Sequence, residues 1–258
     1  MPLATTGRLA IHCTETVGRC SLFLINAFRH CSSGGSLWER FIRALHESGV
    51  RCVPVILIVA TFTGMVLGLQ GHYVLSRFGA SGLLGTLVSL SLCRELAPVL
   101  AALMIAGQAG SSIAAELGMQ RTTEQIDALE LLGIRPEGFL VGQRLIASIL
   151  TYPILTCAFV LVGTYGGYLA GCVLLPVPAT EFWASVHEAI RPRDIQECLI
   201  KSLTFGLLCT TIACYSGFHN HLSGLSGARA VSLGTVRAVV ASSIAVLATD
   251  YLITSLLV

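Results

Sequence analysis

Long charge-free runs of apolar residues recur along this chain, and each predicts a helix that crosses a membrane. A helix needs about 20 residues to cross the hydrocarbon core of a bilayer. Runs of that length predict five crossings: near 53–75, within 84–110, near 145–172, near 197–217 and near 236–257. We therefore expect an all-α integral membrane protein.

The second apolar run leaves the number of crossings open. The stretch 78–115 is too long for one crossing, and Arg94 and Glu95 divide it. Two crossings would need a tight turn at SLCRELAP, which has no Gly or Asn to form one. We therefore predict a single helix that carries the charged pair, with 78–86 as its entry.

An amphipathic segment precedes the first span. Residues 36–49, SLWERFIRALHESG, place large apolar side chains on one face of a helix, and Ser36 has the side chain of an N-cap. This pattern predicts a helix that lies at the membrane interface. We divide the chain accordingly into a cytoplasmic and interfacial segment, 1–52, and a transmembrane domain, 53–258.

The sequence EQIDALELLG, at 124–133, predicts a short water-facing helix between the second and third spans. Its charged side carries Glu124, Asp127 and Glu130. Leu131 is the one apolar projection among these acids. Thr122 and Gln125 have the spacing of a capping box, and Gly133 can end the helix. A helix with such locally encoded ends favours docking of a soluble partner over simple linkage.

The third span carries a flat strip of small residues, Gly163, Gly167 and Gly171, at intervals of four. Such a strip lets another helix approach closely. Because these strips are common in membrane bundles, we expect packing within the subunit rather than a contact between subunits. The loop that follows, 173–196, predicts an external segment with a short helix at 180–190.

Composition supports the membrane assignment. Hydrophobic residues make up 54% of the 258 residues and charged residues 12%, about half the charged fraction of a soluble domain. The net charge of +2 and the absence of a basic run argue against nucleic-acid binding. The ten cysteines form no C-x-x-C pair, so we predict no metal site. Arg19 and Arg29 interrupt any cleavable signal pattern, and we take residue 1 as part of the mature protein.

The distribution of basic residues predicts the orientation. Six arginines precede residue 52, three lie between 116 and 144, and two between 218 and 237. The other set of loops carries Arg77, Arg191 and Arg193, with Lys201 nearby. Since positive charge favours the cytoplasmic side, we expect the N-terminus in the cytoplasm and the C-terminus outside.

Few charges lie at membrane depth, where each costs about 2.5–3.5 kcal/mol unless it is paired or hydrated. Arg94 and Glu95 are neighbours that point about 100° apart on a helix, so each needs another partner. They are candidates either for a structural bridge or for a polar cavity that accepts a lipid headgroup. For Lys201 and Asp250 three roles are open: a mutual ion pair, side chains that extend to the membrane surface (snorkelling), or contact with the substrate. Gln108 favours a helix-packing hydrogen bond over a ligand contact.

Sequence motifs for chemistry are absent. The chain has no G-x-x-x-x-G-K-[ST] phosphate loop, so it cannot bind and hydrolyse ATP in the usual way. H-E-x-x-H, G-x-S-x-G and paired Cys/His clusters are also missing. We therefore predict a transport or scaffolding protein rather than an enzyme, without a catalytic residue or a cofactor of its own.

Three segments resemble the MlaE (YrbE) permease family of lipid-transporting ABC systems: GMVLGLQG at 64–71, SLCRELAPVLAALMIAGQAGSSIAAELG at 91–118 and TEQIDALELLGIRP at 123–136. The resemblance runs from about residue 36 to the C-terminus. It implies a homodimer in the bacterial inner membrane, with an N-terminal interfacial helix and five spans per subunit. It also implies two ATPase subunits that bind ATP, a periplasmic MCE-domain protein, in some systems a STAS-domain protein, and a phospholipid substrate.

The same resemblance assigns roles to residues. Arg94 and Glu95 match the charged pair that lines the lipid cavity of relatives, and Lys201 and Asp250 match polar positions of less defined role. The helix at 123–132 matches the cytoplasmic coupling helix, so Glu124, Asp127, Glu130 and Leu131 become candidates for ATPase docking. Relatives carry GRAG or GRVG where this chain reads GQAG, so Gln108 occupies the place of an arginine at the lipid pocket.

Two other classes of function stay open at this point. An ion-coupled secondary transporter would use paired intramembrane acids and an internal repeat, and the sequence shows no such repeat. A membrane scaffold that transports nothing would tolerate changes at Arg94 and Glu95.

Overall fold

The computed structural model describes residues 15, 18–29, 37–220 and 227–257. Over these ranges the chain forms helices and turns, and no strand is present. Within the described ranges, five helical stretches are long and apolar enough to cross a membrane: Trp38–Arg77, Ser81–Thr122, Glu137–Leu174, Pro192–Phe218 and Ala228–Leu256. The predicted class, an all-α integral membrane protein, is confirmed, and the second crossing is one continuous helical stretch.

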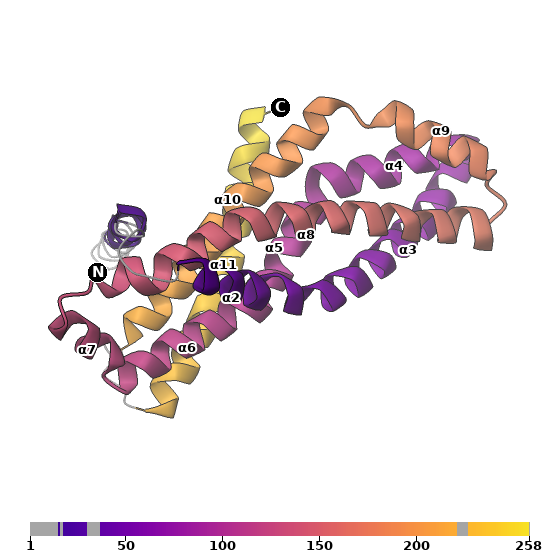
Figure 1. Cartoon of the computed structure of the whole chain (residues 1–258). Coiled ribbons are helices and arrows are strands. Elements are labelled where there is room, and N and C mark those ends of the chain that lie inside the picture. Colours follow the sequence, from indigo (N-terminus) through magenta and orange to yellow (C-terminus); the bar gives the residue numbers. More distant parts are fainter. Residues whose placement is uncertain (1–14, 16–17, 30–36, 221–226, 258) are drawn as a thin grey trace, which may run out of the picture.

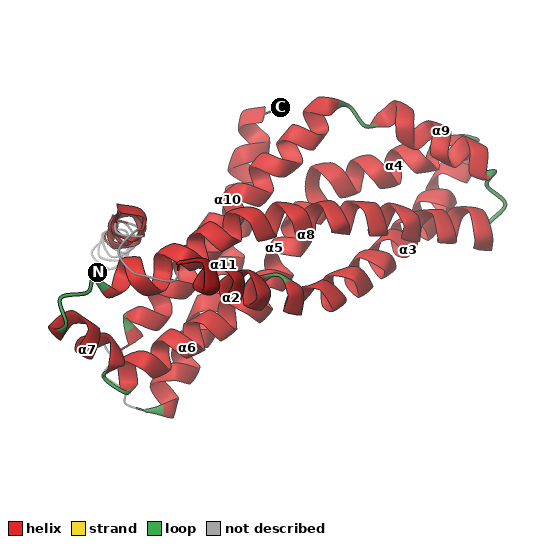
Figure 2. Ribbon diagram, viewed as in Figure 1, coloured by secondary structure: helices red, strands yellow, loops and turns green. Residues whose placement is uncertain are grey.

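Several of these stretches contain more than one element (Figure 2). In chain order the elements are α2 (Leu37–Ser48), η1 (Val50–Cys52), α3 (Val53–Arg77), η2 (Ser81–Leu83), α4 (Leu84–Ser91), η3 (Leu92–Leu96), α5 (Ala97–Ile105), η4 (Ala106–Gly110), α6 (Ser111–Thr122), α7 (Gln125–Leu131), η5 (Glu137–Val141), α8 (Gly142–Tyr168), η6 (Leu169–Leu174), α9 (Ala179–Ala189), α10 (Pro192–Phe218) and α11 (Ala228–Leu257). The elements η3 to η6 are π-helical, and η1 and η2 are 3₁₀-helical.

The spans form an elongated bundle (Figure 1). One end carries α7, the helical residues 18–29 and the start of α11, and the opposite end carries α9, while the C-terminal end of α11 lies beside the start of α10. The predicted short helix near 180–190 is confirmed as α9. The predicted amphipathic helix before the first span is α2, and its proposed cap, Ser36, lies outside the described residues.

The helix over 18–29 holds part of the N-terminal segment against the bundle. Phe23 is 4% exposed, and its ring lies 5.6–5.8 Å from the rings of Tyr215, Phe218 and His219 at the end of α10. Aromatic pairs at such distances add stability beyond the area that they bury. The segment before the spans therefore contributes to the core at this end.

Helices α3 and α8 pack through glycines on both sides. An added Cβ on Gly64 would lie 1.8 Å from the carbonyl oxygen of Gly163, and one on Gly68 would lie 2.8 Å from that of Gly167. Gly171 of the same strip lies against Leu84. In an apolar solvent helices associate through close van der Waals contact, which small residues permit. The strip serves packing inside the subunit, as predicted.

The water-facing helix differs from the expectation in how it begins. Thr122 is the last residue of α6, and its hydroxyl donates to the carbonyl of Gly118 at 2.8 Å. Glu124 precedes α7 in a left-handed conformation, with φ 57°, and no side chain in the described part of the chain caps the helix. The predicted capping box is therefore wrong, because α6 continues through Thr122 and uses its hydroxyl. Gly133, with φ 74°, ends the helix as predicted.

The glycine contact generates a stability prediction. We expect Gly64→Ala to destabilise the protein by about 1–3 kcal/mol, because the new methyl group meets the backbone of α8, which cannot turn aside. Gly107→Ala is the matched control, since an added Cβ there meets nothing within 4 Å. Thermal unfolding of the purified variants in one detergent measures the difference. Equal midpoints for the two variants would contradict this account of the α3–α8 contact.

Candidate functional site

A buried ion cluster joins three of the spans, and Lys201 of α10 lies at its centre. The Lys201 side chain is 3% exposed, although α10 is a membrane span. Its ammonium donates hydrogen bonds to the carbonyl of Arg94 at 2.9 Å, to Glu95 Oε2 at 2.8 Å and to Thr254 Oγ1 at 2.8 Å. These three acceptors use its three N–H groups.

Asp250 of α11 completes the pairing of Lys201. Its Oδ1 lies 3.0 Å from the Lys201 nitrogen, so the two side chains form an ion pair. Of the three roles predicted for Lys201 and Asp250, the structure thus shows the mutual ion pair. Snorkelling of Lys201 is wrong, because its charge is withdrawn from the surface.

Arg94 makes a second ion pair, with Asp194 in the first turn of α10. Arg94 Nε and Nη2 lie 2.8 and 2.7 Å from Asp194 Oδ1. The other oxygen of Asp194 accepts from the backbone N–H of Arg191 at 2.9 Å and so caps α10. Arg94 and Glu95 therefore have separate partners, as their angular separation on the helix predicts.

Local backbone geometry prepares the Arg94 carbonyl for Lys201. Residues 92–96 form a π-helical turn, and Pro98 follows it. Proline has no N–H to donate to the carbonyl four residues earlier, which here is that of Arg94. The oxygen that a regular helix would satisfy accepts instead from the Lys201 ammonium.

The cluster leaves two of its charges partly accessible. The side chains of Arg94 and Glu95 are 50% and 45% exposed, whereas those of Lys201 and Asp194 are 3% exposed. The buried groups hold the two exposed groups in fixed positions. One exposed cation and one exposed anion, side by side among apolar spans, can contact a polar group that enters between lipids.

Gln108 does not belong to this cluster. It lies 14 residues after Arg94 on the same helical stretch, roughly 20 Å along the axis. Its amide donates to the carbonyl of Arg51 at 3.1 Å. The structure therefore shows the helix-packing hydrogen bond, and it does not bring Gln108 together with Arg94 and Glu95.

The docking candidates lie around α7 at one end of the bundle (Figure 1). Asp127 and Glu130 both face Arg121 of α6, whose Nη1 lies 2.7 Å from Asp127 Oδ1 and 3.9 Å from Glu130 Oε1. Glu124 is exposed, and Leu131 is 91% exposed. Leu131 is thus a large apolar side chain in open solvent beside partly paired acids.

Sequence reasoning missed two members of the cluster, Asp194 and Thr254. The predicted loop 173–196 includes Asp194, although Pro192 and an acid in the next two positions are typical of the first turn of a helix. That pattern could have extended α10 back to its true start. No sequence pattern pairs Asp194 with Arg94, which lies 100 residues away.

The fold and the cluster define a class: a multi-pass, all-α membrane protein with an ion cluster among its spans. The family described as "Permease MlaE" matches residues 41–256. A probable ABC transporter permease protein of Rickettsia felis is 40% identical over 252 residues, which cover 98% of this chain and 96% of that protein.

Two further relatives are more distant. The intermembrane phospholipid transport system permease protein MlaE of Haemophilus influenzae is 33% identical over 256 residues, which cover 99% of this chain and 97% of that protein. The chloroplastic protein TRIGALACTOSYLDIACYLGLYCEROL 1 of Arabidopsis thaliana is 33% identical over 218 residues, which cover 84% of this chain and 61% of that protein. The chain belongs to the MlaE permease family.

The ion cluster generates a second prediction. Lys201→Met should destabilise the protein by about 3 kcal/mol, because it leaves the Glu95 and Asp250 carboxylates without their cation. Adding Glu95→Gln and Asp250→Asn to this variant should recover most of the loss, since those charges are then gone. Thermal unfolding of the single and triple variants measures both effects. A triple variant no more stable than Lys201→Met would refute the assigned pairing.

Proposed function

We propose that this chain is the permease subunit of an ABC transporter that moves phospholipid between the inner membrane and a periplasmic MCE-type lipid-binding protein. A separate ATPase binds ATP and drives the movement. The observation that carries the proposal is the buried cluster around Lys201, which presents Arg94 and Glu95 on a family scaffold whose Haemophilus influenzae member is named for intermembrane phospholipid transport.

The charges of the cluster suit a lipid headgroup. Arg94 keeps N–H groups beyond those that face Asp194, and guanidinium groups bind phosphoryl oxygens well. Asp194 and Lys201 hold Arg94 and Glu95 in place before a ligand arrives, which lowers the cost of binding. In the proposed homodimer, the exposed sides of Arg94 and Glu95 of both copies line one lipid cavity. Gln108 lines the route of the lipid at another depth in the membrane.

The proposed arrangement in the membrane follows the arginine count. The end with α7 and residues 18–29 lies in the cytoplasm, where two ATPase subunits reach it, and in some systems a STAS-domain protein accompanies them. The end with α9 and the C-terminus lies in the periplasm, where the MCE-domain protein receives or delivers lipid. The presence of α7 and the N-terminal helix at one end of the bundle supports this assignment (Figure 1).

Docking of the ATPase rests on α7 and its exposed leucine. Leu131 can enter an apolar pocket on the partner, while Glu124, Asp127 and Glu130 supply charge around it. Truncation of an interface residue that is central and fully desolvated commonly costs 2 kcal/mol or more. Because Asp127 and Glu130 also pair with Arg121, charge reversal there would disturb the permease itself. Leu131 is therefore the cleaner position for a test.

Headgroup contact predicts a defect in transport at Arg94. Arg94→Gln should lower lipid-stimulated ATP turnover of the reconstituted complex roughly tenfold, since it removes a charged hydrogen-bond donor. Arg193→Gln is the control, because it removes the same charge from a side chain in the first turn of α10 that is 72% exposed. Wild-type turnover in Arg94→Gln would contradict the pocket. Lipid movement that persists without any ATPase would instead favour an ion-coupled transporter.

Docking predicts a separate defect at Leu131. Leu131→Ser should weaken copurification of the ATPase at least tenfold while the permease stays folded, because the side chain touches little of its own subunit. Leu256→Ser is the matched control, an 84% exposed leucine near the C-terminal end of α11. Quantitative gel analysis of the amount of ATPase bound per permease measures this effect. Full retention of the ATPase by Leu131→Ser would exclude Leu131 as a contact.

A further inference from the structure

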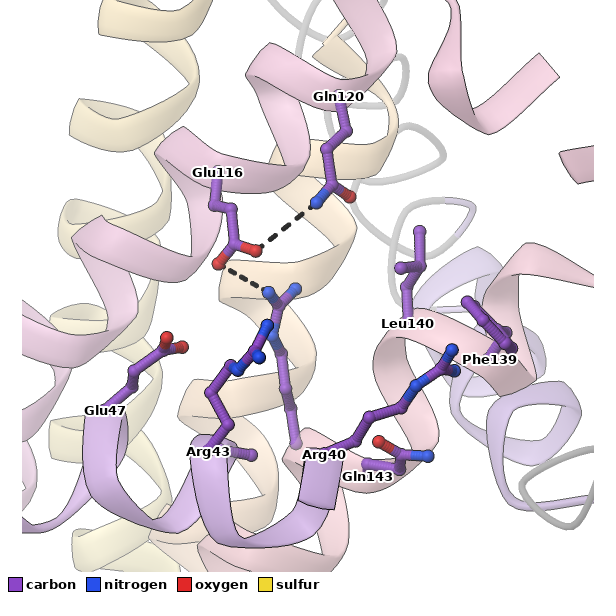
Figure 3. Close-up of a pocket in the computed structure, with 10 residues that line it drawn as sticks. Arg40, Arg43, Glu47, Glu116, Gln120, Phe139, Leu140 and Gln143 are labelled. Carbon is purple, nitrogen blue, oxygen red and sulfur yellow. Dashed lines mark hydrogen bonds and ion pairs between the residues drawn. The ribbon is translucent and has the colours of Figure 1, made fainter. Parts of the chain in front are cut away.

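A second charged site lies far from the Lys201 cluster, beneath the amphipathic helix α2. It is a pocket of about 210 Å³ between α2, α6 and the start of α8 (Figure 3). Its charged wall consists of Arg40, Arg43, Glu47, Glu116 and Arg144. Three arginines against two glutamates leave the pocket one positive charge in excess.

Contacts within the protein satisfy only part of the hydrogen-bonding capacity of these arginines. Arg144 Nη2 lies 2.6 Å from Glu116 Oε2, and the Gln120 amide donates to Glu116 Oε1 at 3.3 Å (Figure 3). The Arg40 guanidinium lies over the Phe139 ring, 3.5 Å from its centroid. This contact attracts the cation but accepts no conventional N–H hydrogen bond.

Two guanidinium nitrogens in this wall are buried without an acceptor among the described residues. They are Nη1 of Arg40 and Nη1 of Arg144, and Arg144 as a whole is 8% exposed. A buried polar donor without a partner costs about 1–3 kcal/mol, and more when it is charged. Ordered water or a bound ion commonly satisfies such groups, so this pocket offers donors to an acceptor that the described residues do not supply.

We infer that this pocket binds a phosphoryl group, held by Arg40, Arg43 and Arg144. Guanidinium groups match phosphoryl oxygens in charge and in the geometry of paired hydrogen bonds. Arg43 is exposed, and its guanidinium points from α2 toward Glu116, so it can turn to contact a group that enters the pocket (Figure 3). Bound there, a phosphoryl group ties α2 to the start of α8.

The phosphoryl group comes from a lipid headgroup or from free phosphate. The outer face of α2 carries Trp38 and Ile42, which are 70% and 46% exposed, and such a face lies among lipids at a membrane interface. The headgroup of a lipid beside α2 is therefore within reach of Arg40 and Arg43. This anion site is additional to the headgroup contact proposed at Arg94 and does not depend on it.

Trp38 offers a local readout that the Arg94 site does not affect. The chain has two tryptophans, so Trp183→Phe leaves Trp38, on α2, as the single fluorescent reporter. Full-length protein with this change is titrated in detergent with dioleoyl phosphatidylglycerol, with dioleoylglycerol, which has the same chains and no phosphoryl group, and with inorganic phosphate. A saturable change with phosphatidylglycerol and none with dioleoylglycerol is expected.

Variants of opposite expected effect separate binding from misfolding. Arg40→Gln with Arg43→Gln should weaken the response at least tenfold, and Arg51→Gln, outside the pocket on the same side of the bundle, should leave it unchanged. Glu116→Gln should strengthen the response several-fold, because the Glu116 carboxylate then no longer competes with the phosphoryl group for Arg144. Arg94→Gln should change lipid-stimulated turnover without changing this response, so failure here and failure of the transport proposal give different results.

The outcomes decide between the sources as well. A response to phosphatidylglycerol alone assigns the site to a lipid headgroup, and an equal response to inorganic phosphate assigns it to a soluble anion. The proposal is overturned if neither phosphatidylglycerol nor inorganic phosphate gives a saturable response, or if dioleoylglycerol gives the same response as phosphatidylglycerol. It is also overturned if the Arg40→Gln/Arg43→Gln variant responds as the parent protein does.

Discussion

The structure depends on one buried charge, the ammonium of Lys201. Withdrawing it from water costs several kcal/mol, which is recovered only if every N–H finds an acceptor and an opposite charge lies close. The acceptors come from η3 and from α11, while the lysine itself is on α10. Three spans are therefore fixed to one another at a single point. The exposed charges of Arg94 and Glu95 take their positions from this arrangement.

Close packing of glycines solves a different problem, the association of α3 with α8. Lipid tails are as apolar as the side chains they would replace, so burial alone gives these helices little reason to associate. Gly64 and Gly163 bring the two backbones into contact, which gains dispersion energy that larger residues would prevent. The ion cluster and the glycine contact thus stabilise different pairs of spans by different forces.

The helical stretch Ser81–Thr122 connects the two regions that the proposed mechanism uses. The charged pair lies about one third of the way along it, and α7 follows its end after a short turn. A movement imposed on α7 by an ATPase would reach α6 directly, since Arg121 of α6 pairs with Asp127 and Glu130. In the proposed mechanism this stretch transmits the movement toward Arg94 and Glu95, and the π-helical turns at η3 and η4 are where its geometry departs from a rigid α-helix.

The sequence by itself determined the class of fold, the five spans, α2, α9 and the C-terminal end of α7 at Gly133, because hydrophobic period and local turn chemistry encode these features within a few residues. It also marked Arg94, Glu95, Lys201 and Asp250 as costly charges. Only the tertiary structure decided that Lys201 joins Glu95 to Asp250, that Asp194 holds Arg94, and that Gln108 binds a distant carbonyl instead. The physical reason is that pairing of charges depends on which helices lie side by side: Arg94 and Asp194 are 100 residues apart, and Lys201 and Glu95 are 106 residues apart, separations that no local pattern records.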